Sequence, residues 1–210
     1  MRSGAAVAER PGERTFTEKA RRAQIVQAAI ETSAELGYGR ASLARIAEKL
    51  GISKGVISYH FAGKDDLIKE VVLEVLESGK AYMRSRVDPE SSGPEALHAY
   101  IESNLAFMGE HPNYMVAIVE IGRNGLSADG QRRFYGDADV DDAVRILEGA
   151  LARFQAAGEM RQDFDPRVMA VAIRAAIDAV PRRLAHDPQL DVDNYAREIA
   201  NLFDRATRVE

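Results

Sequence analysis

Small, polar and basic side chains gather in one short segment of the chain, residues 53–64. Lys54, Tyr59, His60 and Lys64 supply ammonium, phenol and imidazole groups there, with serine, glycine and valine between them. Such groups donate hydrogen bonds to phosphate oxygens and to the edges of bases. The segment therefore indicates contact with nucleic acid.

Two short helices joined by a tight turn must position these donors. The first helix carries one apolar stripe at helical spacing, made of Leu43, Ile46, Ala47 and Leu50. Gly51 is expected to end it, because glycine adopts the left-handed C′ conformation without strain. Ser53 is the expected N-cap of the second helix, and Ile57 is its inward residue. The pattern predicts a helix-turn-helix whose second helix enters the major groove.

The candidate DNA contacts are Ser42, Ser53, Lys54, Gly55, Val56, Ser58, Tyr59, His60 and Lys64. Ser42 caps the first helix, contacts a phosphate, or does both. Lys54 reaches either a guanine or a phosphate, Gly55 permits a close backbone approach, and Val56 suits a thymine methyl group. Phe61 is assigned to the core. The alternative is an ordinary solvated basic face.

The same region resembles a known family. The match consists of Gly37-Tyr38, Ser42 to Ile46, Gly51 to Gly55, Tyr59-His60-Phe61 and Lys64 to Ile68, and it spans about the first third of the chain. Together these residues resemble the TetR family of bacterial transcriptional regulators. The resemblance implies phosphate contact by Ser42, a divergent ligand-binding domain downstream, and a homodimer.

Composition and charge fit that reading. The 210 residues carry a net charge of −5, contain no cysteine, and are 46% hydrophobic and 29% charged. Residues 1–64 hold 11 Lys and Arg against 6 Asp and Glu, whereas the rest of the chain holds 17 against 27. A basic module joined to an acidic body places DNA affinity at one end. Without a disulfide framework or an apolar run of about 18 residues, the chain is expected in the cytoplasm.

The pattern predicts an all-α protein. Residues 1–16 form a tail, residues 17–64 a three-helix DNA-binding domain, and residues 65–210 a helical domain for effector binding and dimerisation. Helices are expected at about 18–36, from 64, and at 95–110, 112–124, 137–158, 165–186 and 192–207. Pro181 is expected to kink or stop the 165–186 segment.

The downstream domain offers soft and aromatic side chains rather than a catalytic motif. The candidate effector residues are Phe107, Met108, Tyr114, Met115, Ile118, Phe134, Phe154, Met169 and Ile173. Such a set is usually core, but the resemblance implies that part of it lines a cavity for a small apolar or amphipathic effector. Glu102, Glu120 and Asp178 lie on otherwise apolar stretches, where they either orient a polar effector group or face solvent.

The last two expected helices are the predicted dimer seam. Its residues are Ala172, Ala175, Ala176, Ala179, Ile199, Leu202 and Phe203. Small side chains on one helix and large ones on the other would form an isologous four-helix bundle across a two-fold axis. The alternative is that both helices complete the monomer core.

Metal and catalytic sites are not expected. The four histidines are widely spaced, and none has a second ligand at i+3 or i+4. Residues 137–148 place acids at several calcium-loop positions, but Asp142 stands where the turn needs glycine and Arg145 where a ligand belongs. The better interpretation is a helix that begins with acidic residues, which interact favourably with the helix dipole. We therefore predict no metal, no cofactor and no enzymatic activity.

The expected function is a ligand-responsive transcriptional regulator, most simply a repressor. A homodimer would bind double-stranded DNA at a pseudo-palindromic operator and be released by its effector. The alternatives are an activator or a nucleoid-associated protein. From a different class, the rival is a helical ligand carrier or enzyme with a vestigial helix-turn-helix.

Overall fold

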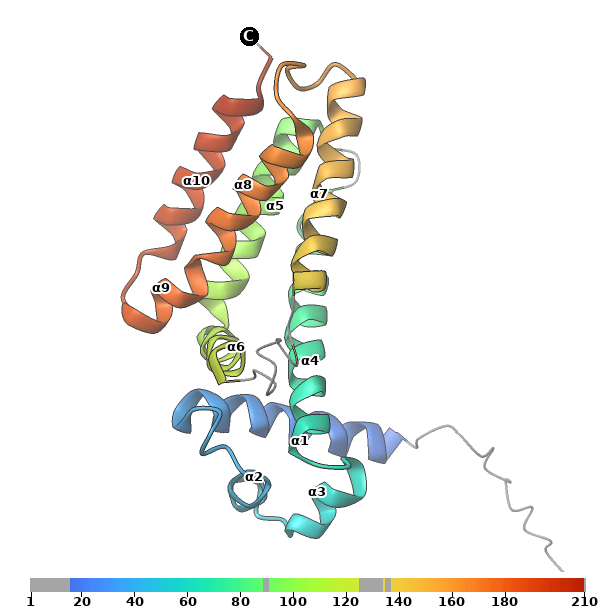
Figure 1. Ribbon diagram of the computed structural model, residues 1–210, viewed down its shortest axis with the longest axis vertical. Helices are drawn as coiled ribbons and strands as arrows, with labels where there is room; N and C mark the ends of the chain where they lie inside the picture. Colours follow the sequence, from blue (N-terminus) through green and yellow to red (C-terminus); the bar gives the residue numbers. More distant parts are fainter. Residues whose placement is uncertain (1–15, 89–90, 125–133, 135–136, 210) are drawn as a thin grey trace, which may run out of the picture.

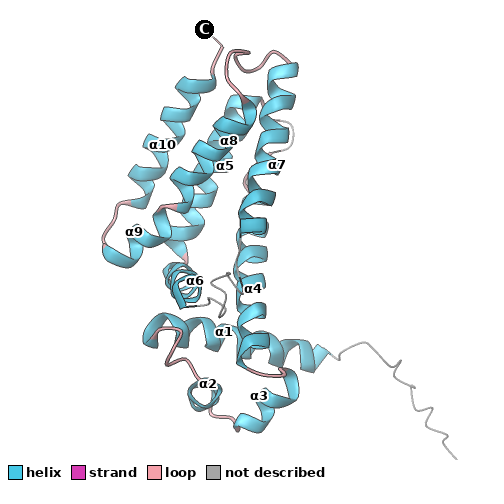
Figure 2. Cartoon of the chain, viewed as in Figure 1, coloured by secondary structure: helices cyan, strands magenta, loops and turns pink. Residues whose placement is uncertain are grey.

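The chain folds as a set of helices. The computed structural model describes residues 16–88, 91–124, 134 and 137–209, with only the backbone of 137–140. The helices are α1 (Phe16–Leu36), α2 (Leu43–Leu50), α3 (Lys54–His60), α4 (Lys64–Arg84), α5 (Gly93–Glu110), α6 (Pro112–Asn124), α7 (Asp137–Ala156), α8 (Pro166–Asp178), α9 (Val180–His186) and α10 (Val192–Thr207). No strand forms in this part of the chain (Figure 2). The all-α prediction is confirmed, and the expected tail lies almost wholly outside the described residues.

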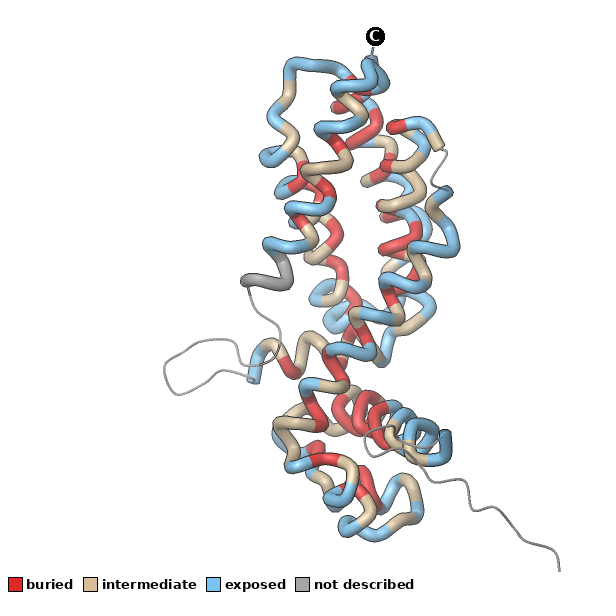
Figure 3. Tube along the Cα trace, turned by 90° about the vertical axis from the view of Figure 1, so that its right-hand side faces the viewer, coloured by how far each residue is buried: buried red, intermediate tan, exposed pale blue. Residues whose placement is uncertain are grey.

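The helices form two packed regions along the long axis of the molecule. Helices α1, α2 and α3 make one end, which we call the head, and α5 to α10 make the other, which we call the body (Figure 1). Helix α4 leaves the head and runs up into the body. Buried residues follow the inner sides of the helices in both regions (Figure 3). The apolar core therefore continues from the head into the body through α4.

Head and body also meet where α6 lies against α1. The Tyr114 hydroxyl on α6 donates to Gln27 Oε1 on α1 at 3.1 Å. At the end of α1, Gly37 has a φ of 77°, and a β-carbon there would lie 3.0 Å from Glu120 Oε2 on α6. Glycine at this position thus serves both the turn and the close approach of α6.

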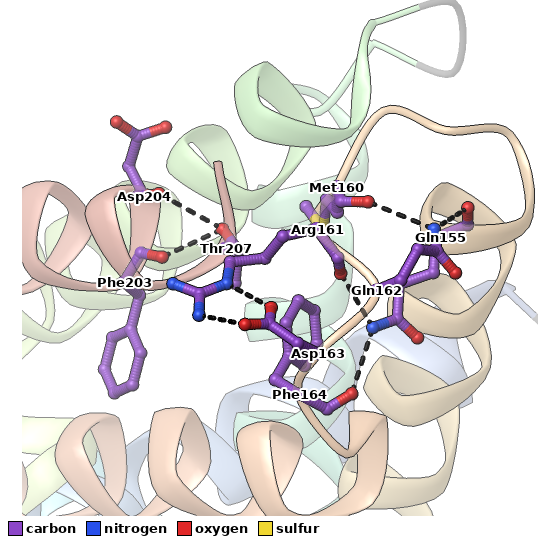
Figure 4. Close-up of polar contacts among 9 residues, drawn as sticks. All are labelled: Gln155, Met160, Arg161, Gln162, Asp163, Phe164, Phe203, Asp204 and Thr207. Carbon is purple, nitrogen blue, oxygen red and sulfur yellow. Dashed lines mark hydrogen bonds and ion pairs between the residues drawn. The ribbon is translucent and has the colours of Figure 1, made fainter. Parts of the chain in front are cut away.

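The body is a bundle in which α5 packs between α10 and α8, with α7 beside α8. The chain end is tied back to the turn after α7. Arg161 N donates to Thr207 O at 2.9 Å, and the Gln155 side chain holds the carbonyls of Arg161 and Phe164 (Figure 4). These bonds give backbone groups in an irregular turn their partners and fix where α8 begins.

The predicted effect of Pro181 is confirmed. The expected segment 165–186 is divided at Ala179 into α8 and α9, with the proline in the first turn of α9. Proline lacks the N–H that a continuous helix would need, and its ring clashes with the carbonyl four residues earlier. No helix among the described residues is long and apolar enough to cross a membrane.

We predict that Gly93→Ala destabilises the body. A β-carbon on Gly93 would lie 2.7 Å from Phe154 Cγ, so α5 or α7 would have to shift. Overpacking of this kind costs about 1–3 kcal/mol, measured as a lower urea midpoint of unfolding. Gly122→Ala is the matched control, because a β-carbon there meets nothing within 4 Å and alanine favours the helix. Equal midpoints for the two variants would contradict the packing described here.

Candidate nucleic-acid interface and effector body

Helix α2 has the predicted caps at both ends, whereas Ser53, the predicted N-cap of α3, makes no side-chain capping bond. Ser42 Oγ accepts a hydrogen bond from Arg45 N at 3.3 Å, which is an N-cap interaction. Gly51 ends α2 with a φ of 64°, and its N–H bonds back to the last turn of the helix. Ile52 N then donates to Ala47 O at 3.0 Å. Local hydrogen bonding therefore sets the angle at which α3 leaves α2.

Helix α3 is anchored by its apolar side. Ile57 is fully buried, and Phe61, which follows the helix, is 2% exposed. Both assignments to the core are confirmed. The opposite side of the helix faces outward, with Tyr59 74% exposed and Lys54 exposed beside it. One side of α3 holds it to the head, and the other is available to a partner.

The structure brings most of the predicted DNA contacts to the outer end of the head. Exposed positions are Ser42, Ser53, Lys54, Gly55, Ser58 and Tyr59, and partly buried ones are Val56, His60 and Lys64. The Ser53 side chain makes no capping bond to α3 and is exposed. The Tyr59 hydroxyl donates to Glu18 Oε1 at 3.1 Å, and this bond raises the pKa of Tyr59. Polar groups on a short, firmly packed helix match the geometry of a groove-reading element.

The Lys64 side chain is held against the protein and does not extend freely towards a phosphate. Its ammonium donates to Tyr38 O at 2.5 Å and lies 4.1 Å from the centroid of the Tyr38 ring. Partial burial lowers the pKa of Lys64. The amine is thus held against the loop between α1 and α2, and its remaining N–H donors are left for a phosphate.

Arg22 on α1 supports the end of α3 and was not among the predicted site residues. Its guanidinium donates to His60 O at 2.5 Å, pairs with Glu70 of α4 at 2.8 Å, and lies 4.1 Å from the centroid of the Phe61 ring. The side chain is only 12% exposed. Arg22 therefore fastens the end of α3 to both α1 and α4. A signal was present, because Arg22 lies one turn before the buried Ile25 on the same stripe.

The predicted effector residues all belong to one apolar core or pack against it, and they differ in burial. Phe107, Met108, Met115 and Ile173 are buried, whereas Tyr114, Ile118, Phe134, Phe154 and Met169 are partly buried.

Three of the predicted aromatic residues pack against side chains or backbone in different parts of the molecule. Phe107 stacks on His111 with ring centroids 4.5 Å apart, near the junction of α5 with α6. Phe154 lies against Gly93 at the other end of α5, about 20 Å away along the helix. The Phe134 ring lies 6.2 Å from that of Tyr38, in the head. Phe107 and Phe154 thus lie at opposite ends of α5, whereas Phe134 packs against a residue of the head.

A shallow open cleft of about 690 Å³ lies between α1, α2 and α4. Its lining combines polar and apolar groups and includes Gln24, Gln27, Glu31, Lys49 and Leu50. None of the predicted effector residues lines it. The cleft is open and lies on the side of the head, with charged groups in its lining, which distinguishes it from an enclosed apolar effector site.

Apart from Phe203, the predicted dimer residues are exposed or partly buried positions on α8 and α10, and α8 passes in front of α5 in Figure 1. Ala172, Ala175 and Leu202 are exposed, and Ala176, Ala179 and Ile199 are partly buried. Phe203 is different, because its side chain is 8% exposed and belongs to the core of the protomer itself. Val168 and Val171 on α8 are 67% and 49% exposed, and the sequence analysis did not select them.

The acidic segment at the start of α7 has ordinary partners where it is described. Asp142 pairs with Arg145 at 2.7 Å, and Glu148 pairs with Arg167 at 3.2 Å. The side chains of Asp137 and Asp139 lie outside the described residues. Among the side chains that are described, no group of three or more potential metal ligands occurs.

Residues 25–71 match the family described as bacterial regulatory proteins, tetR family. The chain is 39% identical over 86 residues to the HTH-type transcriptional regulator BetI 1 of Chromohalobacter salexigens, covering 40% of this chain and only 43% of that protein. It is 24% identical over 182 residues to the fatty acid metabolism regulator protein of Bacillus subtilis, covering 86% of this chain and 92% of that one.

Similarity of fold extends over nearly the whole chain. The crystal structure of the transcriptional regulator FadR from Bacillus subtilis in complex with stearoyl-CoA superposes with a TM-score of 0.73 at 20% identity. The superposition covers 86% of this chain and 96% of that one. The sequence match is thus strongest in the head, and the structural match includes the body.

We predict that Arg22→Gln weakens both the head and its binding to DNA. The change removes a buried charged hydrogen bond, which costs about 1.5–3 kcal/mol, and frees the end of α3. Arg21→Gln is the matched control, because Arg21 is exposed and loses the same charge. Urea unfolding and DNA affinity at one salt concentration measure the two effects. Equal losses of stability and of DNA affinity in the two variants would mean that Arg22 contributes no more than an exposed positive charge does.

Proposed function

The chain belongs to the TetR family of bacterial regulatory proteins, and we propose that it is a cytoplasmic transcriptional repressor released by a small effector. In this proposal residues 17–64 bind DNA, residues 65–210 bind the effector and dimerise, and residues 1–16 are a tail. The observation that carries it is the outer face of α3, where exposed donors lie opposite a buried anchor made by Ile57 and Phe61.

The face of α3 suits a major groove better than a protein surface. Its donors are small or flexible, and Lys54 stands at the first turn, where recognition helices contact base edges. Ser42 and Tyr59 flank it and suit phosphates. One seven-residue helix makes too few base contacts for useful specificity, so two copies about 34 Å apart are required.

The face of α8 and α10 supports a second copy of the chain as the partner. Val168, Val171 and Leu202 are large apolar side chains left 49–67% exposed on it. Ala172 and Ala175 between them allow another helix to approach closely. An isologous contact of this face would hold two heads at a fixed spacing at the far end of the molecule.

The contact of α6 with α1 supports regulation through the body. An effector acts only to the extent that it binds one arrangement of the heads more tightly than another. Tyr114 with Gln27, and Glu120 with Gly37, join the body to the helix that carries Arg22. A displacement of α6 would therefore reach the support of α3.

The effector class is proposed from the interior of the body and from the relatives. The methionine and aromatic residues of α5, α6 and α8 are soft side chains that can repack around an apolar ligand. One relative is named a fatty acid metabolism regulator, and one structural neighbour is described in complex with stearoyl-CoA. We therefore propose an amphipathic molecule with an alkyl or acyl chain.

Binding to DNA upstream of the chain's own gene, measured by gel shift at several salt concentrations, tests the proposal. Lys54→Ala is expected to weaken operator binding by about 1–3 kcal/mol and to relax the preference at one position of each half-site. Lys80→Ala is the control, because it removes an equal exposed charge from α4, far from α3. A uniform loss over operator variants would make Lys54 a phosphate contact, and failure of the wild-type protein to bind any such DNA would refute the function.

A charge in the proposed dimer face tests the assembly. Ala175→Glu is expected to give folded monomers with weaker operator binding, because two glutamates would be buried near the two-fold axis. Ala152→Glu on the exposed side of α7 is the matched control. Sedimentation reports the oligomeric state, and circular dichroism reports folding. Dimers of unchanged strength in the Ala175 variant would exclude this face.

A further inference from the structure

A polar cluster lies between α5 and α8 in the body. Arg174 of α8 donates from Nη1 to the Tyr100 hydroxyl at 2.9 Å and to Asn104 Oδ1 at 3.3 Å. Its Nη2 donates to Asp178 Oδ1 at 2.5 Å. The Arg174 side chain is 11% exposed, and that of Asp178 is 34% exposed. The guanidinium is therefore well inside the bundle, and its carboxylate partner lies nearer to water.

The surroundings of this cluster are apolar. On α8, Ala170, Ile173 and Ile177 are fully buried, and on α5, Ile101 and Leu105 are fully buried on either side of Asn104. A few convergent polar groups within an apolar interior are typical of small-molecule sites. Stability alone does not account for them, because well-packed apolar residues commonly replace a buried ion pair at no loss.

From this arrangement we propose that Arg174 binds the anionic group of the effector, a carboxylate or a phosphate, and that Asp178 occupies the same position in the ligand-free protein. The inference rests on the proposed function and specifies the chemistry of its effector. A planar guanidinium matches both anions with paired hydrogen bonds. Tyr100 and Asn104 hold the guanidinium from α5, so that it stays in place when the carboxylate leaves.

Asp178 is suited to being displaced. It is one helical turn from Arg174 on the same helix, so a change of rotamer separates the pair without moving the backbone. Its side chain already reaches solvent in part. Burial raises the pKa of Asp178 in spite of the neighbouring arginine, so the carboxylate recovers hydration when it turns outward.

Two substitutions that break the same ion pair distinguish ligand binding from a structural role. Arg174→Gln removes the group that binds the anion, whereas Asp178→Asn removes the internal competitor. Affinities of the full-length variants for decanoate, decanoyl-CoA and the uncharged decanol are measured by calorimetry. We expect Arg174→Gln to lose about tenfold or more in affinity for the anion that the wild-type protein binds, with decanol unaffected. Asp178→Asn is expected to bind that anion severalfold more tightly.

Each outcome is decisive. Similar losses for both variants with all three probes would assign the cluster to structure and overturn the proposal. Binding of decanol alone, or of none of the probes, by the wild-type protein would also overturn it. Preference for decanoate or decanoyl-CoA identifies the source of the anionic group. If Arg174→Gln does not fold, Arg174→Lys provides the test, with a smaller loss expected because the charge remains and the paired geometry does not. Operator binding by the ligand-free protein is measured in parallel. This measurement tests the proposed function directly, so the proposed function can stand even when the proposal about Arg174 fails.

Discussion

The shortness of α3 is the constraint on which the rest of the structure depends. A helix of seven residues is not stable alone in water, so its position must come from tertiary contacts. Ile57 and Phe61 supply an apolar anchor, and Arg22 holds the carbonyl of His60 at the end of the helix. These contacts occupy one side of α3 completely. The other side therefore carries the polar groups, and the core contacts of α3 fix their position.

The same contacts make the head sensitive to the body. Arg22 is shared between α3 and Glu70 of α4, and α4 continues into the bundle. Helix α6 also contacts α1 at Gln27 and lies close to the turn at Gly37. A movement of α4 away from α1 would break the Arg22–Glu70 ion pair, and a movement of α6 would break the Tyr114–Gln27 hydrogen bond. In the proposed function, these supports of α3 are the contacts through which an effector in the body would act on the head.

The body departs from a simple apolar bundle in two ways, and each departure has a different physical consequence. Large apolar side chains remain exposed on α8 and α10, a feature typical of surfaces that bind partners. Charged and polar groups are buried between α5 and α8, although burial penalises charge. Helix α8 contributes to both, with Val171 and Ala175 on its outer side and Arg174 directed towards α5. A ligand at Arg174 and a partner on the outer face would act on one helix.

What the sequence alone determined is local. Gly51 at the end of α2, the inward Ile57, the break near Pro181 and the all-α class follow from backbone conformation and helical spacing, which a few neighbouring residues define. The tertiary structure decided which distant residues meet. Arg22 and His60 are 38 positions apart, and Arg174 and Tyr100 are 74 apart. It also decided that Phe203 faces the protomer's own core, because helical spacing defines an apolar face without specifying its partner.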